Sequence, residues 1–489
     1  MPKNLDLLLV NAGGARKKAY QSLSQDYSAI EPPFWAALTA GFIRRNGYGV
    51  GILDANAENI DFQETAEKIK TLNPRFVGIV VYGQHPSAST QTMDAVAKLC
   101  RTIKLRDPKI KIILSGLHPS ALPEKTLKEE QCDYVACGEG FYTFLDLLLE
   151  KEPAETRGLA FRKDGEVLFG AKAELVKNLT EELNDVAWDL LPMDKYKAHN
   201  WHCLHNLNSR NSYAAIYTSL GCPFSCSFCC INTPFGKQGY RTWSPEWVLK
   251  NIDTLVREYG IKNIKIIDEL FVLKPEHFMP ICKGLIERDY GLNFWAYARI
   301  DTAKEEYLEK MKQAGINWLA VGIESGSEEV RKDVSKGRFN SDEIKTVVER
   351  IRREGINVIG NYIFGLPEDN LKNMAETLNL AQELNCEWAN FYSAMAYPGS
   401  RLYFEAKEQG LLLPEDTGNG WAGYSQTSYE TLPLPTKYIS AEQVLRFRDE
   451  AFMKYFTNPE YLNMIEKKFG LEARKHIEEM TKIKLKRKL

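Results

Sequence analysis

The feature that most constrains the fold is an alternation of short apolar runs with helical stretches over about the first 150 residues. Each run has the length of a buried strand. Strands that alternate with helices form a parallel, doubly wound α/β sheet. The sequence therefore predicts a Rossmann-like, flavodoxin-like domain over residues 1–150. Its five strands are expected at Leu5–Val10, Val50–Leu53, Phe76–Val81, Lys111–Leu114 and Tyr134–Ala136.

Loops that contain glycine and polar residues follow these predicted strands. Parallel sheets of this kind bind ligands at the carboxyl ends of their strands. We therefore expect a ligand site to include the loops Tyr82-Gly83-Gln84-His85, Ser115-Gly116-Leu117-His118 and Gly138-Glu139-Gly140.

A second series of strands and helices begins at Tyr213 and predicts a partial (β/α)6 barrel over residues 211–410. Residues 151–210 are interpreted as a connector that includes a hairpin turn. Residues 411–489 begin with a stretch containing Pro and Gly and predict a small, mostly helical capping region. The six barrel strands are expected at Ala215–Thr218, Ile264–Ile267, Phe294–Ala298, Trp318–Gly322, Val358–Phe364 and Trp388–Tyr392.

Composition narrows the classes of function. The chain has 489 residues, with 63 Lys and Arg against 65 Asp and Glu, which argues against a nucleic-acid partner. The start, Met1-Pro2-Lys3-Asn4-Leu5, is no apolar leader, and no run reaches the ~18 apolar residues of a membrane span. We expect a cytoplasmic protein without stable membrane insertion. The basic residues Lys482 to Leu489 are interpreted as a solvated, frayed end.

Four of the ten cysteines lie between Cys222 and Cys230, which predicts a metal site rather than a disulfide framework. Cys222, Cys226 and Cys229 share one tight loop after a predicted strand. Iron–sulfur clusters are usually held by four thiolates. Three thiolates would leave one iron free to bind a substrate or a cofactor.

A zinc site is the alternative. It needs four Cys or His ligands, and the fourth would come from Cys230 or from His202, Cys203 or His205. Zinc sites typically pair one C-x2-4-C motif with a second such pair, which disfavours zinc here. Cys230 directly follows Cys229 and is interpreted as a packed thiol.

The CxxxCxxC motif resembles that of the radical S-adenosylmethionine (SAM) superfamily. Segments that resemble its other strand-end motifs are Asp268-Glu269, Arg299, Gly322-Ile323-Glu324-Ser325-Gly326-Ser327 and Ile363-Phe364-Gly365-Leu366-Pro367-Glu368. The resemblance covers about residues 213 to 405. It implies a [4Fe-4S] cluster whose open iron is chelated by SAM, and cleavage of SAM to methionine and a 5′-deoxyadenosyl radical. A flavodoxin or ferredoxin is the expected reductant.

The same resemblance implies contacts with SAM. Glu324 would bind the ammonium or a ribose hydroxyl, Arg299 would pair with the carboxylate, and the backbone around Gly365 and Pro367 would flank the adenine. Each residue also has a structural interpretation. Glu324 caps a helix, Arg299 forms an ion pair, and Gly365 and Pro367 shape a turn.

The N-terminal part resembles the cobalamin-binding domain that precedes the barrel in the class B methyltransferase-like subgroup. The segments are Glu31-Pro32-Pro33, Gly47-Tyr48, Ser115 to Glu124 and Asp133 to Gly140. The DxHxxG signature that supplies a histidine to cobalt is absent, as is frequent in this subgroup. Loss of the cofactor is the alternative. The expected cobalamin contacts are Tyr82, Gln84, His85, Ser115, Gly116, His118, Gly138 and Glu139.

These resemblances predict a cobalamin-dependent methyltransferase that acts on an unactivated carbon of a small-molecule, lipid or glycan-type substrate. A radical enzyme of the same architecture that catalyses dehydration, cyclisation or rearrangement is the first alternative. A cluster or cobalamin sensor is a more remote one, because no output module is evident. Catalytic residues are left unassigned. Candidates for substrate contact are Trp295, Tyr297, Asn361, Asn390, Tyr392, Trp421 and Tyr424.

Overall fold

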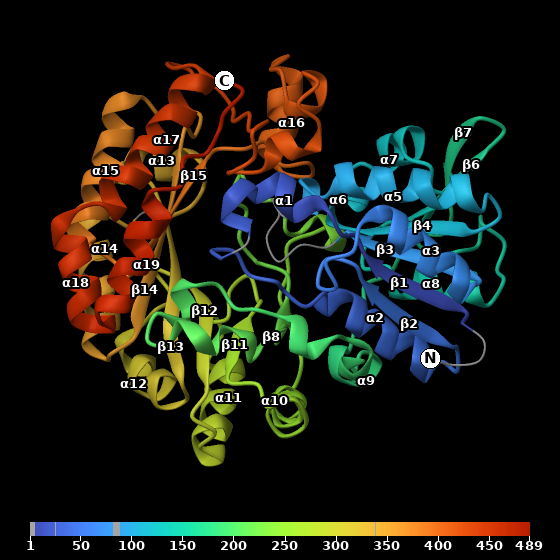
Figure 1. Cartoon of the computed structure of the whole chain (residues 1–489), viewed down its shortest axis with the longest axis horizontal. Helices are drawn as coiled ribbons and strands as arrows, with labels where there is room; N and C mark the ends of the chain where they lie inside the picture. Colours follow the sequence, from blue (N-terminus) through green and yellow to red (C-terminus); the bar gives the residue numbers. More distant parts are fainter. Residues whose placement is uncertain (1–4, 25, 82–88, 338) are drawn as a thin grey trace.

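The structure, a computed structural model, describes residues 5–24, 26–81, 89–337 and 339–489. The predicted cobalamin contacts Tyr82, Gln84 and His85 lie outside the described residues. The chain forms two α/β lobes side by side, the N-terminal lobe in blue and cyan and the barrel lobe in green to orange (Figure 1). No described helix is both long and apolar enough to cross a lipid bilayer.

The N-terminal lobe contains the predicted doubly wound sheet. Its first five strands are parallel and take the order 2-1-3-4-5, which is typical of flavodoxin-like domains. A hairpin with Gly165 in its turn adds two antiparallel strands at one edge, so part of the predicted connector extends this sheet. The strands are β1 (Leu7–Asn11), β2 (Val50–Asp54), β3 (Phe76–Val81), β4 (Lys111–Gly116), β5 (Tyr134–Ala136), β6 (Leu159–Lys163) and β7 (Glu166–Phe169).

Helices cover both faces of this sheet, which explains why β2 is buried along its whole length. Helices α2 (Phe34–Arg45) and α8 (Phe141–Leu148) pack on one face. Helices α3 (Phe62–Leu72) and α5 (Met93–Arg106) pack on the other. Two short helices follow strands at their carboxyl ends, α1 (Ala15–Tyr20) after β1 and α6 (Leu117–Ala121) after β4, and α7 (Pro123–Glu129) packs beside β5 and β6.

The second lobe confirms the partial barrel. Six strands pair in parallel in the order β15-β14-β13-β12-β11-β8, with β8 and β15 at the two edges. The strands are β8 (Tyr213–Ile216), β11 (Asn263–Ile266), β12 (Asn293–Arg299), β13 (Ile316–Glu324), β14 (Asn357–Phe364) and β15 (Trp388–Ser393). The connecting helices are α10 (Pro245–Tyr259), α11 (Pro275–Arg288), α12 (Glu305–Gln313), α13 (Glu328–Asp333), α14 (Ser341–Arg353) and α15 (Leu371–Leu384).

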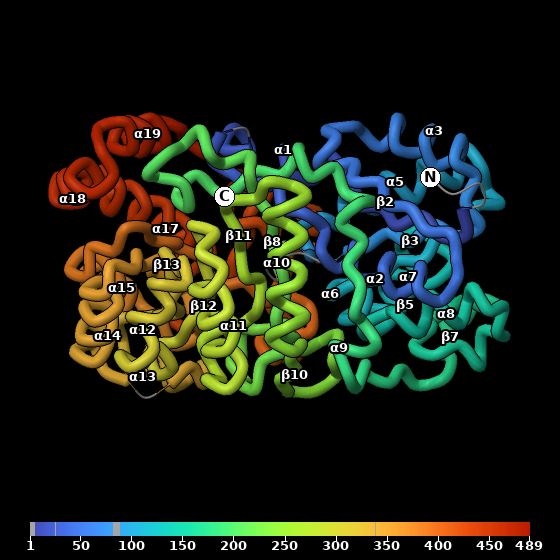
Figure 2. The backbone as a smooth tube through the Cα atoms, turned by 90° about the horizontal axis from the view of Figure 1, so that it is seen from below, coloured from blue at the N-terminus to red at the C-terminus, as the bar shows by residue number. Residues whose placement is uncertain are grey.

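The C-terminal region is mostly helical, as predicted. Helix α16 (Arg401–Glu408) lies toward the N-terminal lobe, whereas α17 (Ala441–Phe456), α18 (Pro459–Phe469) and α19 (Leu471–Thr481) pack outside β14 and β15 (Figures 1 and 2). Ser440 caps α17 by accepting a hydrogen bond from the backbone of Gln443.

The segment between the lobes closes the amino end of the barrel. Trp201 packs against three strand tryptophans, with ring centroids 5.1 Å from Trp295, 5.6 Å from Trp318 and 6.5 Å from Trp388. These rings bury a large apolar area and seal the floor of the lumen. Access to the interior is therefore from the carboxyl ends of the strands.

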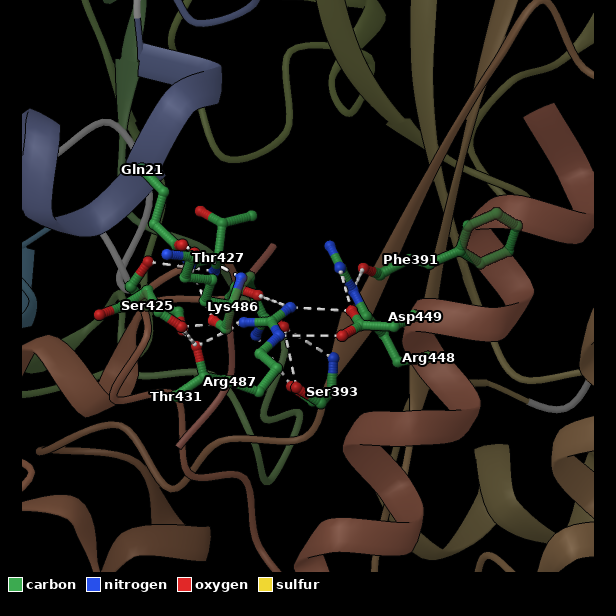
Figure 3. Close-up of polar contacts among 12 residues, drawn as sticks. Gln21, Phe391, Ser393, Ser425, Thr427, Thr431, Arg448, Asp449, Lys486 and Arg487 are labelled. Atoms are coloured by element: carbon green, nitrogen blue, oxygen red, sulfur yellow. Dashed lines mark hydrogen bonds and ion pairs between the residues drawn. The ribbon is translucent and has the colours of Figure 1, made fainter. Parts of the chain in front are cut away.

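The prediction of a frayed end is wrong for residues 486–488, although Lys482, Lys484, Lys486 and Lys488 are exposed to solvent as predicted. Arg487 pairs with Asp449 through two hydrogen bonds of 2.9 and 2.8 Å, and its side chain is only 10% exposed. The backbone of Lys488 donates to Tyr429. The Arg487 side chain is therefore bound by backbone carbonyls and a carboxylate that come from distant parts of the chain (Figure 3).

Candidate active site

The cysteine loop is held open at the carboxyl end of the first barrel strand. Gly221, with φ +86°, begins it and passes so close to Gly239 that a β-carbon would lie 2.8 Å from the Gly239 carbonyl oxygen. Asn232 closes it by exchanging two hydrogen bonds with the backbone of Cys222, of 3.1 and 2.9 Å. This geometry excludes a side chain at Gly221 and fixes the loop.

The three predicted ligands, Cys222, Cys226 and Cys229, are half-buried, whereas Cys230 is buried against Leu117 and Ile231. Thiols that share one loop and keep solvent access suit a cluster that must bind another molecule. The donor set of three thiols fits a [4Fe-4S] cluster with one open iron.

The zinc alternative is not supported by the geometry. His202 and Cys203 hydrogen-bond to Asn293 and Asn263, the first residues of β12 and β11, at the opposite end of the barrel from the cysteine loop. Within the described ranges, no three His, Cys, Asp or Glu side chains, the three cysteines of the loop included, lie close enough together to bind a single metal ion.

Positive charge lies next to the cysteine loop. The guanidinium of Arg299, at the end of β12, lies 3.8 Å from the ring centroid of Phe224, within the loop. Arg299 is fixed by Asp301, at 2.8 and 3.0 Å, and by the carbonyl of Lys336, at 2.5 Å. Burial lowers the pKa of Arg299, but Asp301 and the nearby thiols raise it more, so the guanidinium stays charged.

Glu324 ends β13 in a left-handed backbone conformation, φ +66°, which is rare for a residue with a β-carbon. Its Oε1 lies 2.7 Å from the Nζ atom of Lys336. Gly322 leaves room for this pair, because a β-carbon there would lie 2.5 Å from both atoms. Lys336 could not be predicted as a partner of Glu324 from the sequence, because it lies outside the strand-end motifs. Strained residues of this kind cluster at functional sites, so the pair of Glu324 and Lys336 is a candidate for one.

The loop after β14 contains Gly365 and Pro367. Asp369 accepts hydrogen bonds from the backbone of Gly365, at 2.9 Å, and of Leu366, at 3.3 Å. Gly365 has φ +83°, and a β-carbon there would meet Val444 at 2.4 Å. The turn therefore requires glycine, and the carbonyl of Pro367 is held by the backbone of Lys437 at 3.2 Å.

The inner face of the barrel keeps solvent access toward its carboxyl end. Tyr297, Asn361, Asn390 and Tyr392 are half-buried, whereas their neighbours along each strand are buried. Asn390 donates to Asn361 at 2.9 Å across β15 and β14. Four of the seven candidate substrate contacts thus line one open surface.

The other three candidates lie elsewhere. Trp295 is buried at the floor of the lumen. Trp421 and Tyr424 pack against the N-terminal lobe in one cluster with Met395 and Tyr397, which follow β15, and not on the inner face of the barrel strands. Their sequence neighbourhood gave no sign of this, because it depends on how the C-terminal region folds back over the first lobe.

The predicted cobalamin contacts that the structure describes lie at the carboxyl ends of β4 and β5. The hydroxyl of Ser115 is buried and has no hydrogen-bond partner among the described residues. Gly116, at φ +118°, leads into α6. Burial lowers the pKa of His118 to about 3, so its imidazole is neutral, and its ring centroid lies 4.4 Å from that of Trp421 in an edge-to-face arrangement.

Glu139 joins the two lobes. One carboxylate oxygen accepts from Arg241 at 2.7 Å and the other from the backbone of Val176 at 2.7 Å. The neighbouring Gly138 borders a cavity of about 1080 Å³ between the N-terminal sheet and the segment 233–241 that follows the cysteine loop. This cavity suits a ligand between the lobes, although Ser115 is not among the residues that line it.

The ligand edges of the two sheets meet. Leu117, directly after β4, packs against Cys230 and Ile231 of the cysteine loop. A β-carbon on Gly138, after β5, would lie 3.4 Å from the carbonyl oxygen of Pro234. The two predicted cofactor sites therefore face one another.

Comparison with known proteins agrees with this arrangement. The family models for the B12 binding domain and for the Radical SAM superfamily match residues 25–148 and 216–381. The chain is 30% identical over 439 residues to an uncharacterized methyltransferase of Pyrococcus horikoshii, covering 88% of this chain and 89% of the relative. It is 26% identical over 401 residues to the anaerobic magnesium-protoporphyrin IX monomethyl ester cyclase of Rubrivivax gelatinosus, covering 79% and 68%.

A solved structure has the same fold. The radical SAM methyltransferase TsrM from Kitasatospora setae, with cobalamin and a [4Fe-4S] cluster bound, aligns with a TM-score of 0.69 at 16% identity and covers 93% of this chain and 89% of its own. Such proteins use a [4Fe-4S] cluster, SAM and cobalamin. The half-buried thiols of this chain suit the cluster, and the facing loops of the two lobes suit SAM and cobalamin. The chain belongs to the radical SAM superfamily, to the group of enzymes that carry a B12-binding domain before the barrel.

Proposed function

We propose that this enzyme methylates an unactivated carbon of a small-molecule, lipid or glycan-type substrate. The observation that carries the proposal is the direct contact between Leu117 of the B12-binding lobe and Cys230 and Ile231 of the cysteine loop. A substrate between the lobes would be within reach of both cofactor sites at once. Such proximity is what a two-cofactor reaction needs from its protein.

The residues divide into two sets in this proposal. Cys222, Cys226 and Cys229 hold the cluster. Glu324 and Arg299 bind the amino-acid or ribose part of SAM, and Gly365 and Pro367 flank its adenine. On the other lobe, cobalamin is bound by Ser115, Gly116, His118, Gly138 and Glu139, with Tyr82, Gln84 and His85 as further contacts outside the described residues.

When bound, the cluster and SAM supply a carbon radical and cobalamin supplies the methyl group. The protein's own residues position the bound groups and shield them from water. Arg299, fixed by Asp301, presents a permanent positive charge to an anionic group. Asp369 holds the Gly365–Leu366 turn in shape. The tryptophan floor around Trp201 keeps water from entering behind the substrate.

A radical enzyme that does not methylate is the second candidate. The Rubrivivax gelatinosus relative is named a cyclase and not a methyltransferase, yet 68% of its length aligns with this chain. Rearrangement and methylation share the first chemical step, so the fold does not separate them. Which of the two reactions follows depends on the substrate and on the side chains of the inner face of the barrel.

We further propose a flavodoxin or ferredoxin as reductant, a cytoplasmic location, and no nucleic-acid partner. The near balance of 63 basic and 65 acidic residues supports the last point.

The test is anaerobic purification with hydroxocobalamin supplied during expression, followed by iron, sulfide and cobalt analysis. About four iron and one cobalt per chain are expected from the two sites. The loaded enzyme is then incubated with reduced flavodoxin or ferredoxin, with SAM labelled in its methyl group, and with candidate substrates. Label in the product supports methylation. Formation of 5′-deoxyadenosine with an altered but unlabelled product supports the second candidate, and absence of cobalt with intact iron contradicts the cobalamin assignment.

A further inference from the structure

The cavity beside the cysteine loop is bordered by the chain on both sides of the predicted cluster ligands. Leu220 and Gly221 directly precede Cys222, and residues 233–241 follow the loop. The opposite wall comes from the N-terminal lobe, mainly from residues 169–177 at and after the end of β7. Residues 236–239 on the rim are exposed, so this cavity of about 1080 Å³ is open to a molecule from outside the protein.

Two glycines form the wall between this cavity and Cys222. The backbone N–H of Gly239 donates to the Cys222 carbonyl at 3.3 Å. A β-carbon on Gly221 would lie 2.8 Å from the Gly239 carbonyl oxygen, so the two backbone segments are in contact. On its other side Gly239 is exposed, and only its chain neighbours lie within 4 Å of the position that its β-carbon would take. At this point the wall is backbone without side chains.

The cavity carries an excess of positive charge. The exposed lysines that line it are Lys172, Lys177 and Lys237. Glu174 offsets one of them, because it lies 3.9 Å from Lys177. Arg241 and Glu139 also line the cavity, but they neutralise each other at 2.7 Å. The remaining charge comes from two lysines on opposite walls, which favours a partner with an acidic surface.

One aromatic side chain adds apolar surface to the rim. Phe169, the last residue of β7, is 53% exposed and lines the cavity. Transient electron-transfer complexes bury less than about 1,200 Å² in total, so they need only a small contact area. A basic rim with one exposed aromatic ring suits a weak, charge-steered complex better than a permanent one.

We propose that this cavity is the docking site of the acidic carrier protein that reduces the cluster. The class of partner rests on the proposed function, in which a flavodoxin or ferredoxin is the reductant. The carrier loses one electron and the cluster gains it, and no bond is formed or broken. Electron transfer slows steeply with distance. The glycine wall at Gly221 and Gly239 therefore gives a docked carrier a short approach to Cys222.

Stopped-flow reduction of the cluster-reconstituted enzyme tests the charge. The readout is the loss of cluster absorbance with reduced flavodoxin or, separately, reduced ferredoxin. Lys172→Glu combined with Lys237→Glu should lower the second-order rate about tenfold, because it reverses the charge that steers an acidic partner. The matched control combines Lys283→Glu and Lys372→Glu, at side chains of the outer helices α11 and α15 that are 80% and 84% exposed. Equal rates in the two double variants overturn the docking site.

An uncharged reductant separates docking from damage to the cluster. Photoreduced 5-deazariboflavin should reduce wild type and both double variants at the same rate, since it needs no basic surface. A loss of rate with this reductant as large as the loss with the carrier overturns the docking site. If deazariboflavin reduces the wild type and neither carrier protein does, the proposed reductant is wrong as well. Methyl transfer is not needed for any of these measurements.

A variant of the glycine wall tests the distance. Gly239 has room for a side chain and no left-handed backbone, so Gly239→Trp should fold and keep its iron. The added ring would stand between the carrier and Cys222, and it should slow reduction by the carrier about tenfold. A wild-type rate in Gly239→Trp with full iron content would show that the carrier approaches the cluster from another side.

Cross-linking locates the partner without any electron transfer. Oxidised flavodoxin is coupled to the enzyme with a carbodiimide, which joins carboxylates to lysines in contact, and the linked peptides are identified by mass spectrometry. Links at Lys172, Lys177 or Lys237 are expected, and added salt should suppress them. If all three lysines stay unlinked, whether links form elsewhere or not at all, the docking site is wrong and the proposed methylation still stands.

Discussion

Arg299 lies over the ring of Phe224, with its guanidinium carbon 3.8 Å from the ring centroid, so the third barrel strand is in contact with the cysteine loop. Through its hydrogen bond to the Lys336 carbonyl, Arg299 also reaches the residue that pairs with Glu324. The cluster loop and the predicted SAM contacts therefore form one connected structure. A substitution in one of these parts should therefore alter the geometry of the others.

Replacement of Cys222, Cys226 and Cys229 together with Ala should abolish the cluster absorbance and SAM cleavage, because these three thiols are the proposed ligands. Iron analysis and 5′-deoxyadenosine production measure the two effects. The control is Cys230→Ala, whose buried thiol packs against Leu117 and should leave the iron content unchanged. Loss of about a quarter or more of the iron in that control would mean that the protein supplies a fourth ligand.

Lys336→Met should weaken the binding of S-adenosylhomocysteine to the cluster-reconstituted enzyme about tenfold, since it removes the charged partner that orients Glu324. Isothermal titration calorimetry measures the affinity. Lys332→Met is the matched control, because Lys332 is 53% exposed and pairs with Glu328 of its own helix. Equal affinities in the two variants would remove Lys336 from the site.

Glu139→Ala should destabilise the contact between the lobes by about 3 kcal/mol, because it leaves Arg241 without its buried carboxylate. Urea unfolding followed by near-ultraviolet circular dichroism measures the change, and cobalamin retention should fall with it. In contrast, Asp189→Ala breaks an exposed pair with Arg44 and should cost less than about 1 kcal/mol. Similar costs for both variants would show that burial of Glu139 has no energetic consequence.

Strand positions could be predicted from the sequence because buried parallel strands are continuous apolar runs. Phe76–Val81 and Tyr134–Ala136 match exactly, and the six barrel strands differ only at their ends. The cluster loop could also be predicted from the sequence, because its three proposed ligands are close together along the chain. Two ion pairs could not be predicted from the sequence: Glu324 with Lys336, and Glu139 with Arg241. Such contacts depend on tertiary packing and leave no local pattern in the sequence.

The tail shows the same limit. A run of basic residues near a chain end usually remains in solvent, and composition alone favours that interpretation. Here the positions of Asp449 and of the Gln426 and Ser428 carbonyls decide the outcome. Those acceptors come together only after α17 and the 425–431 loop have packed.

The last prediction concerns pH. Burial raises the pKa of Asp369 to about 7, although two backbone donors at Gly365 and Leu366 lower it, and its Oδ1 has no partner among the described residues. A carboxyl whose pKa is higher in the folded than in the unfolded state stabilises the fold at low pH. That stability is complete below the unfolded pKa of about 4 and is lost as the pH rises to about 7.

Asp369→Asn keeps an oxygen acceptor for the turn but cannot ionise. Its melting temperature relative to wild type should therefore rise from about pH 4 to about pH 7 and then stay constant, because only the wild type must ionise a buried group. Differential scanning fluorimetry across this range measures the difference. Asp342→Asn, at a side chain that is 93% exposed, should show no such trend. A difference between Asp369→Asn and wild type that does not change with pH would mean that the Asp369 carboxyl ionises as easily in the folded as in the unfolded chain.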